Sequence, residues 1–308
     1  MLSAMNRGTF LALLLVFAAL VVPAHADEKV LYEKASAFGT IVVTEDDAGL
    51  RTLRFAKGGA RQSVVKPGDP EYLALHYAPV MLSVLALSEE PRRILIVGLG
   101  GGTLPMFLRK HYPDAAIDVV DIDPEVVYVA KEFFGFREDS RMQAHVTDGR
   151  QFIEKTRQPY DVIFLDAFGS DSVPAHLTTQ EFLRAVRRAV KRGGSVAGNL
   201  WGRGYNPLYD SMVRTYQEVF DEVYILDVRE AANKILLALP RTQPLSRDEM
   251  TLIARKVSTA KRFRFDLGEL VSYGYTHVRE KDQRERVLRD PAPAQTRQKS
   301  LPAASQSR

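Results

Sequence analysis

The chain of 308 residues contains no cysteine, and this absence excludes several kinds of chemistry at once. Disulfide bonds, a thiolate nucleophile and cysteine metal ligands are all ruled out. The spacing of histidine, aspartate and glutamate also lacks the pattern of a metal centre, so we expect no metal cofactor. Neither an internal repeat nor a G-x-S-x-G nucleophile motif is present.

A large excess of one charge is missing as well, since 42 lysines and arginines face 38 aspartates and glutamates, for a net charge of +4. Much of the basic excess falls late in the chain, and no basic stripe with interleaved aromatic residues occurs. We therefore expect no nucleic-acid partner. The hydrophobic share of 45% is typical of a globular protein with one large domain and a smaller companion.

One long apolar run stands near the start, from Phe10 to Val22. It follows the basic Arg7 and precedes Ala24-His25-Ala26, a small-x-small cleavage pattern. The run is shorter than the roughly 20 residues that span a bilayer. We therefore expect a signal peptide over residues 1–26 and an exported, periplasmic or secreted protein without a stable membrane span. An uncleaved anchor is the alternative.

Residues 27–88 read as a small N-terminal unit. β-branched or alternating segments at 40–44, 50–55 and 62–65, separated by turn residues at 46–49 (Asp-Asp-Ala-Gly) and 57–59 (Lys-Gly-Gly), predict a small antiparallel sheet of about three strands. Helical spacing of apolar residues then predicts a helix over 70–87.

From residue 89 to 288, strands alternate with helices, which predicts a parallel sheet wound on both faces, an α/β Rossmann-like fold. The expected strands are 94–97, 117–120, 142–146, 161–165 and 195–200, closed by an antiparallel pair at 222–226 and 234–239. The expected helices are 103–111, 123–134, 150–155, 178–190, 206–220 and 245–259, with a capping box at Thr178–Glu181 and a stop at Gly193-Gly194. Residues 289–308 are rich in Pro, Ala, Gln and Ser and are expected to be a disordered tail.

A glycine-rich turn follows the first strand of this domain and supplies the candidate cofactor-binding residues Gly98, Gly100 and Gly102. Glycine lets the backbone turn tightly and lets a nucleotide approach. Asp121, at the end of the second strand, is placed for ribose hydroxyls. Asp148, at the end of the third, is placed for adenine, with Gly149 beside it as a further cofactor-binding candidate, or equally for capping the helical segment after Gly149. NAD is an alternative ligand, but G-x-G-G-G differs from G-x-G-x-x-G, and two acids favour an S-adenosyl compound.

Five strings in combination carry a resemblance to a known family: ILIVGLGGG, VVDIDPEVVYVAKEFF, VTDGRQFI, YDVIFLDAF and HLTTQEF. Together they resemble the spermidine synthases, or polyamine aminopropyltransferases, and in particular a divergent spermidine-synthase-like branch. The resemblance covers residues 29–239. It implies transfer of an aminopropyl group from decarboxylated S-adenosylmethionine to a polyamine-type amine, and it implies a homodimer.

The resemblance also implies roles for single residues. Asp166 would accept the proton of the attacking amine, with Asp171 as a second, offset acid. Asp121 would hold the ribose, Asp148 the adenine, and Gln62 would line the donor site. Candidate acceptor-site residues are His76, Tyr77, His176 and Tyr205, for each of which a packing or loop role is the alternative. Trp201 and Tyr209 fall where an acceptor would enter, and packing at the rim is equally open for them.

One departure from the family keeps the reaction open. An aspartate of the family's glycine loop pairs with the aminopropyl ammonium, and this sequence has Gly101 there. Without that acid, ordinary S-adenosylmethionine is also admitted, so a methyltransferase is the first alternative. A non-catalytic exported adenosyl-binding protein or scaffold is the second, because sulfonium donors are made in the cytoplasm.

Overall fold

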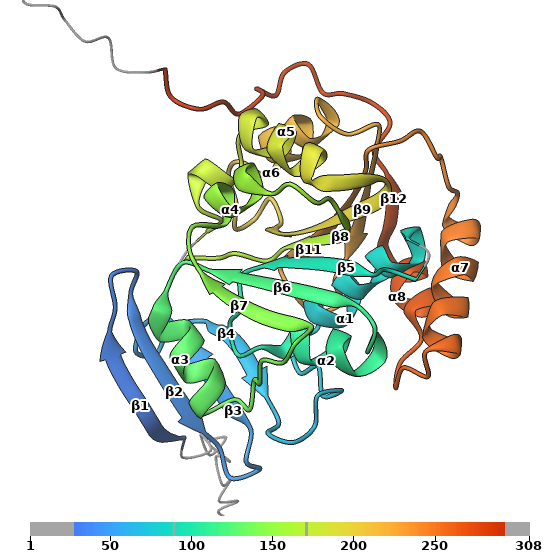
Figure 1. Cartoon of the computed structure of the whole chain (residues 1–308). Helices are drawn as coiled ribbons and strands as arrows, with labels where there is room; N and C mark the ends of the chain where they lie inside the picture. Colours follow the sequence, from blue (N-terminus) through green and yellow to red (C-terminus); the bar gives the residue numbers. More distant parts are fainter. Residues whose placement is uncertain (1–27, 89, 170–171, 293–308) are drawn as a thin grey trace, which may run out of the picture.

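The computed structural model describes residues 28–88, 90–169 and 172–292, which form two sheets (Figure 1). The N-terminal sheet is an antiparallel meander in the order β1-β2-β3-β4. Its strands are β1 (Lys29–Ala35), β2 (Thr40–Glu45), β3 (Arg51–Arg54) and β4 (Arg61–Val65). The predicted small sheet is thus confirmed, with one strand more than the sequence indicated.

The second sheet has eight strands in the order β12-β10-β11-β9-β8-β5-β6-β7. The strands from β9 to β7 in this order run parallel, and β11, β10 and β12 are added antiparallel. Their bounds are β5 (Arg93–Val97), β6 (Ala116–Asp121), β7 (Met142–Val146), β8 (Tyr160–Leu165), β9 (Val190–Trp201), β10 (Glu222–Asp227), β11 (Asn233–Leu239) and β12 (Tyr275–His277). The Rossmann-like fold and the closing antiparallel pair are confirmed.

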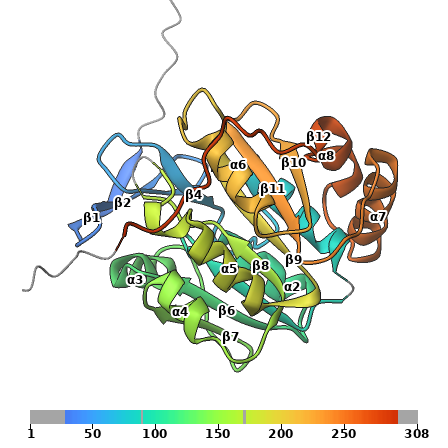
Figure 2. The same ribbon diagram turned by 90° about the horizontal axis from the view of Figure 1, so that it is seen from above.

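Helices cover both faces of this sheet (Figure 2). Alternate residues of β5 belong to different cores: Ile94 and Ile96 pack with one set of helices, and Leu95 and Val97 with the other. The Leu95 face is covered by α4 (Gly149–Lys155), α5 (Gln180–Ala189) and α6 (Tyr209–Gln217). The Ile94 core holds α1 (Tyr77–Met81), η1 (Leu82–Leu87), α2 (Thr103–His111), α3 (Pro124–Glu132), α7 (Arg247–Ala260) and α8 (Leu267–Gly274).

Three local predictions were wrong. The single helix over 70–87 is instead a turn region followed by α1 and the 3-10 helix η1, with Pro79 inside α1. The capping box at Thr178 does not form: Thr179 is the N-cap of α5, and a 3-10 turn, η2 (Ala175–Leu177), precedes it. Gly193 and Gly194 lie within β9, because α5 already ends at Ala189.

Both predicted terminal segments lie mainly outside the described residues. The apolar run of the expected signal peptide falls within residues 1–27, outside the described ranges, as do residues 293–308 of the expected tail. No helix within 28–88, 90–169 or 172–292 is long and apolar enough to cross a bilayer. Asp290, near the start of that tail, is held by an ion pair with Arg150.

Candidate active site

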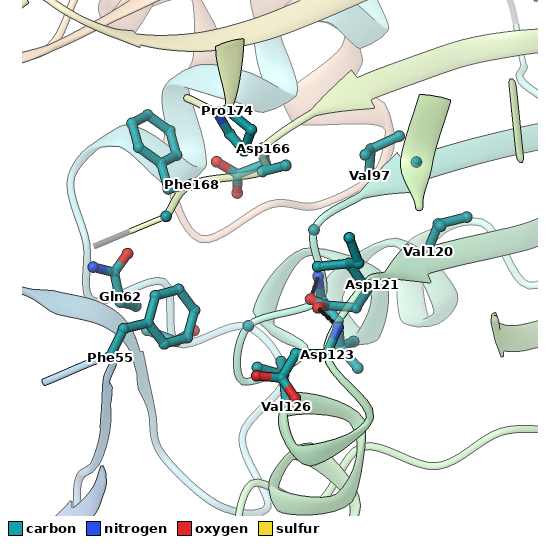
Figure 3. Close-up of a pocket in the computed structure, with 18 of the residues that line it drawn as sticks. Phe55, Gln62, Val97, Val120, Asp121, Asp123, Val126, Asp166, Phe168 and Pro174 are labelled. Atoms are coloured by element: carbon teal, nitrogen blue, oxygen red, sulfur yellow. Dashed lines mark hydrogen bonds between the residues drawn. The ribbon is translucent and has the colours of Figure 1, made fainter. Parts of the chain in front are cut away.

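A cavity of about 290 Å³ opens at the carboxyl ends of β5, β6 and β8. The strand order reverses at β5, with β6 on one side and β8 on the other, and ligands of open α/β sheets bind at such a point. Gln62 and Phe55 reach the cavity from the N-terminal sheet, facing Val97 and Val120 (Figure 3). The site therefore lies between the two sheets.

The glycine turn needs glycine for two separate reasons. Gly98, Gly100 and Gly102 have φ angles of 103°, 54° and 78°, a region that side chains disfavour. A Cβ on Gly98 would also lie 2.4 Å from the carbonyl oxygen of Asp166, so β5 and β8 approach each other only with glycine there. Gly98 and Gly100 line the cavity, whereas Gly102 is the N-cap of α2 and lies against Phe136.

The structure shows which position of the glycine loop faces the cavity, and so where an acid of this loop would reach the ligand. Gly101 does not line the cavity, and a Cβ there would lie 3.0 Å from both Ser63 and Val65 of β4. Gly100 does line it, and a Cβ there would meet nothing closer than Ser63 Oγ at 3.4 Å. The cavity-facing position is therefore Gly100, and the sequence-based choice of Gly101 was wrong. Since both are glycine, the loop carries no acid in either register.

Asp121 ends β6 and ties the glycine turn to the next helix. Its Oδ2 accepts from the Leu99 amide at 2.9 Å, and its Oδ1 accepts from the Asp123 amide at 3.0 Å. Burial raises the pKa of Asp121 to about 6 in spite of these hydrogen bonds. Asp123 in turn caps α3, with its side chain accepting from the Glu125 amide. Asp121 is thus fixed at the cavity wall, and ribose binding stays a prediction.

Asp148 is a helix cap, as one of the two sequence interpretations had it, and it also lines the cavity. Its Oδ1 accepts from the Gln151 amide at 2.9 Å as the N-cap of α4, while the same residue lines the cavity. Its Oδ2 lies 2.8 Å from His176 Nε2. The neighbouring Gly149 is required by packing, because a Cβ there would lie 2.4 Å from Val97. Adenine binding by Asp148 stays a prediction.

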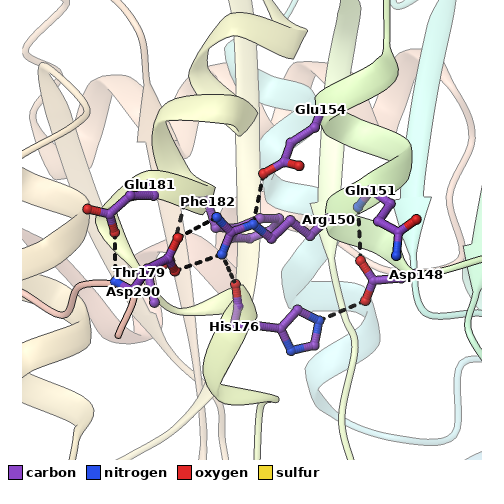
Figure 4. A network of polar contacts seen from close by, with 9 residues as sticks. All are labelled: Asp148, Arg150, Gln151, Glu154, His176, Thr179, Glu181, Phe182 and Asp290. Atoms are coloured by element: carbon purple, nitrogen blue, oxygen red, sulfur yellow. Dashed lines mark hydrogen bonds and ion pairs between the residues drawn. The ribbon is translucent and has the colours of Figure 1, made fainter. Parts of the chain in front are cut away.

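His176, which lines the cavity, belongs to a polar network with Asp148 and Arg150 (Figure 4). Arg150 lies at its centre and donates to the carbonyl oxygen of His176 at 3.2 Å. The same guanidinium pairs with Asp290 at 2.7 and 2.5 Å and with Glu154 at 2.8 Å. The C-terminal segment therefore holds the loop that carries His176 against the start of α4.

Asp166, directly after β8, is the carboxylate at the cavity floor. Tyr77 donates to its Oδ2 at 3.2 Å, and Asn199 donates to its Oδ1 at 2.8 Å. Burial raises the pKa of Asp166 to about 7, and these two hydrogen bonds act in the opposite direction. A carboxylate with such a pKa is suited to accept a proton near neutral pH.

Of the remaining predicted site residues, some line the cavity and others do not. Tyr77, Gln62 and His176 line the cavity. His76 does not: its ring is exposed and bonds the Arg229 carbonyl oxygen. Tyr205 is 70% exposed and also lies outside the lining.

Three further candidates from the sequence are not among the described residues that line the cavity. Asp171 lies outside the described residues. Tyr209 is a core residue, and Trp201 packs against the cavity residue Phe168 with the rings tilted by 36° and their centroids 5.7 Å apart.

Asn199 was missed by the sequence analysis, although a polar residue within the apolar segment Ser195–Leu200 was an available signal. The side chain is 3% exposed, so it needs buried hydrogen-bond partners. Asp166 is one, and Asn233 of β11 is the other, donating to Asn199 Oδ1 at 2.9 Å.

The charged residues of the described cavity wall are all acidic. They are Asp121, Asp123, Asp148 and Asp166, and the lining among residues 28–169 and 172–292 includes no lysine or arginine. A wall of this kind attracts cationic ligands. No group of three or more potential metal ligands occurs within those ranges.

Fold and site together define the class of S-adenosyl-dependent transferases with a Rossmann-like sheet. A family model described as the spermine/spermidine synthase domain matches residues 77–229. A polyamine aminopropyltransferase of Vibrio vulnificus is 34% identical over 222 residues, which is 70% of this chain and 73% of that protein. The chain belongs to the spermine/spermidine synthase family, and this relative is a transferase.

Methyltransferases are similar to this chain as well. A human eEF1A lysine and N-terminal methyltransferase is 32% identical over 214 residues, 63% of this chain, but the match spans only 30% of that longer protein. The crystal structure of human methyltransferase-like protein 13 in complex with SAH is 30% identical, has a TM-score of 0.56, and covers 61% of this chain and 93% of that one. The relatives of this chain therefore include enzymes of two reactions, aminopropyl transfer and methyl transfer.

Proposed function

We propose that the protein transfers an aminopropyl group from decarboxylated S-adenosylmethionine to a polyamine-type amine. The observation that carries the proposal is Asp166, a cavity carboxylate with a pKa of about 7 in a described wall whose charged residues are all acidic. Such a wall favours a donor that carries both a sulfonium and an ammonium group. It equally favours a cationic acceptor.

The chemistry follows from the charges. The lone pair of the amine nitrogen attacks the CH₂ group next to the sulfonium, the C–S bond breaks, and its electrons leave on sulfur as a neutral thioether, methylthioadenosine. The nitrogen gains a positive charge unless its proton departs. Asp166 accepts this proton, and Tyr77 and Asn199 orient the carboxylate. Asp121 and Asp148 would hold the ribose and the adenine.

The second candidate is methyl transfer from S-adenosylmethionine in the same cavity. It is favoured by the glycines at positions 100 and 101, which leave no acid in the loop to repel the donor's carboxylate. The similarity to human methyltransferase-like protein 13 with SAH also supports it. Asp166 would again accept the proton of an attacking amine.

Calorimetric titration separates these reactions. The mature protein is titrated with S-adenosylmethionine, its decarboxylated form and methylthioadenosine, and putrescine turnover is measured in parallel. Tighter binding of the decarboxylated donor together with putrescine turnover supports the proposal. Preference for the carboxylated donor supports methyl transfer, whereas donor binding without turnover of any amine supports a non-catalytic exported protein. No binding of any adenosyl compound would contradict all three.

Export through the predicted signal peptide is part of the proposal. It is supported by the order of Arg7, the apolar run and Ala24-His25-Ala26. N-terminal sequencing of the protein from a secreting host should begin at Asp27. A start at Met1 would contradict cleavage.

A further inference from the structure

We infer that Asn233 is a positioning residue that fixes Asn199 as a hydrogen-bond donor to Asp166. The inference rests on the proposed role of Asp166 as proton acceptor. Asn233 begins β11, whereas Asn199 lies within β9, and neither residue belongs to the glycine turn or to the strand ends that the family resemblance picked out.

The strand register brings the two amides together. β9 and β11 are antiparallel, with Asn199 opposite Ile235 and Asn233 opposite Trp201. Asn233 is thus the diagonal neighbour of Asn199 on the same face of the sheet. Helix α1 packs on both strands and contributes Tyr77. The two donors to Asp166, Tyr77 and Asn199, therefore come from elements that pack directly against each other.

The direction of each hydrogen bond follows from the chemistry of the groups. An ionised carboxylate only accepts, so Asn199 must turn its NH₂ group toward Asp166, at 2.8 Å. The Asn199 carbonyl oxygen then faces away and needs a donor. The NH₂ group of Asn233 supplies it at 2.9 Å. Without that donor, nothing in this chain of contacts prevents the Asn199 amide from turning its oxygen toward Asp166.

The amide orientation matters because it decides which form of Asp166 is favoured. An NH₂ group toward Asp166 stabilises the carboxylate, whereas a carbonyl oxygen stabilises the protonated acid. Among described residues, the groups acting directly on the carboxyl are Asn199 and the titratable phenol of Tyr77. Lys234 and Asp227, beside Asn233, pair with each other at 2.7 Å. The remaining carboxylates of the cavity are Asp121, Asp123 and Asp148.

The test is the isosteric substitution Asn233→Asp, which turns the donor into an acceptor. Asn199 should then donate to the introduced carboxylate and present its own oxygen to Asp166, so the pKa of Asp166 should rise by at least about one unit. The acid limb of the pH–rate profile should shift by that amount, with about tenfold slower turnover below it and a nearly unchanged plateau above it. Asn233→Ala, which adds no charge, should shift the profile in the same direction by less.

Two features of the design keep the outcome decisive. Asn206→Asp, in the loop after β9, is the matched control for an added charge and should leave the profile unchanged. The carboxyl of Asp166 is also titrated directly by ¹³C NMR, with the signal identified by its loss in Asp166→Asn, so the inference is tested even if no turnover is found. An unshifted Asp166 titration in both Asn233 variants, or an equal shift in Asn206→Asp, overturns the inference. If the Asp166 titration shifts in the Asn233 variants but the native chain shows no turnover, the role of Asn233 is supported and only the proposed reaction is contradicted.

Discussion

The phenol of Tyr77 donates to Asp166 Oδ2 at 3.2 Å, from the first turn of α1 to the end of β8. Because the phenol stabilises the ionised carboxylate, Tyr77→Phe should raise the pKa of Asp166 further above 7. We expect turnover to fall roughly tenfold well below pH 7, by about sixfold at pH 7 itself, and to recover as the pH rises, which follows from a hydrogen bond to a charged group of about 1.5 kcal/mol. The measurement is the pH dependence of kcat/KM. A loss that is equal at every pH would contradict this explanation.

The raised pKa of Asp166 also makes a prediction about stability. The unfolded side chain loses its proton near pH 3.8, whereas the folded one keeps it to about pH 7. The folded state binds more protons in this window, so the contribution of Asp166 to stability falls as the pH rises through it. Asp166→Asn should therefore stabilise the fold by roughly 1–3 kcal/mol at pH 8 and by little at pH 4, while abolishing turnover. Thermal unfolding at both pH values measures it.

Asp161, at the other end of the same strand, is the matched control for this experiment. Its carboxylate accepts from the amides of Arg92 and Arg93 and pairs with Lys191, and its pKa is lowered although burial opposes the shift. Its stabilising contribution is present above the unfolded pKa and is lost as the pH falls. Asp161→Asn should thus destabilise the fold at pH 8. Stabilisation by both variants would contradict the assignment of the effect to Asp166.

The two positions of the glycine loop should respond differently to an acid. Gly100→Asp places a carboxylate at the cavity in a conformation that aspartate tolerates at about 1 kcal/mol. It should increase the preference for decarboxylated over ordinary S-adenosylmethionine by at least about tenfold, since like charges repel. Gly101→Asp would crowd Ser63 and Val65, so we expect a lower Tm without a change in preference. Calorimetry and thermal unfolding distinguish the two, and the reverse result would restore Gly101 as the cavity position.

The Arg150–Asp290 pair should contribute measurably to stability because it is bidentate and part-buried. Arg150→Ala should cost about 1–2 kcal/mol, and a double-mutant cycle with Asp290→Ala should give a coupling of about 1 kcal/mol. The exposed pair of Arg284 with Asp282 is the control, and its loss should leave the urea midpoint unchanged because solvent screens the two charges. Equal effects in urea unfolding would show that the network has no special role.

The parts of the fold that follow from local pattern were predictable, and those that depend on distant contacts were not. The strand, glycine turn and helix from Arg93 to His111 could be predicted because each has its own local signal: an apolar segment, a run of glycines and apolar residues at helical spacing. α8 and β12 were missed because their stability comes from packing on α7 and β10. Asn233 shows the same limit within the site, since its relation to Asn199 exists only through the register of β9 and β11.

The contact between Arg150 and Asp290 closes a loop across a sequence separation of 140 residues. During synthesis, everything from the glycine turn to β9 emerges well before Asp290 does. The loop that carries His176 therefore acquires its last anchor only after almost all of the described chain has been made. A nascent chain that has completed its central parallel strands should therefore still lack the contact that holds the cavity wall beside Asp148 in place.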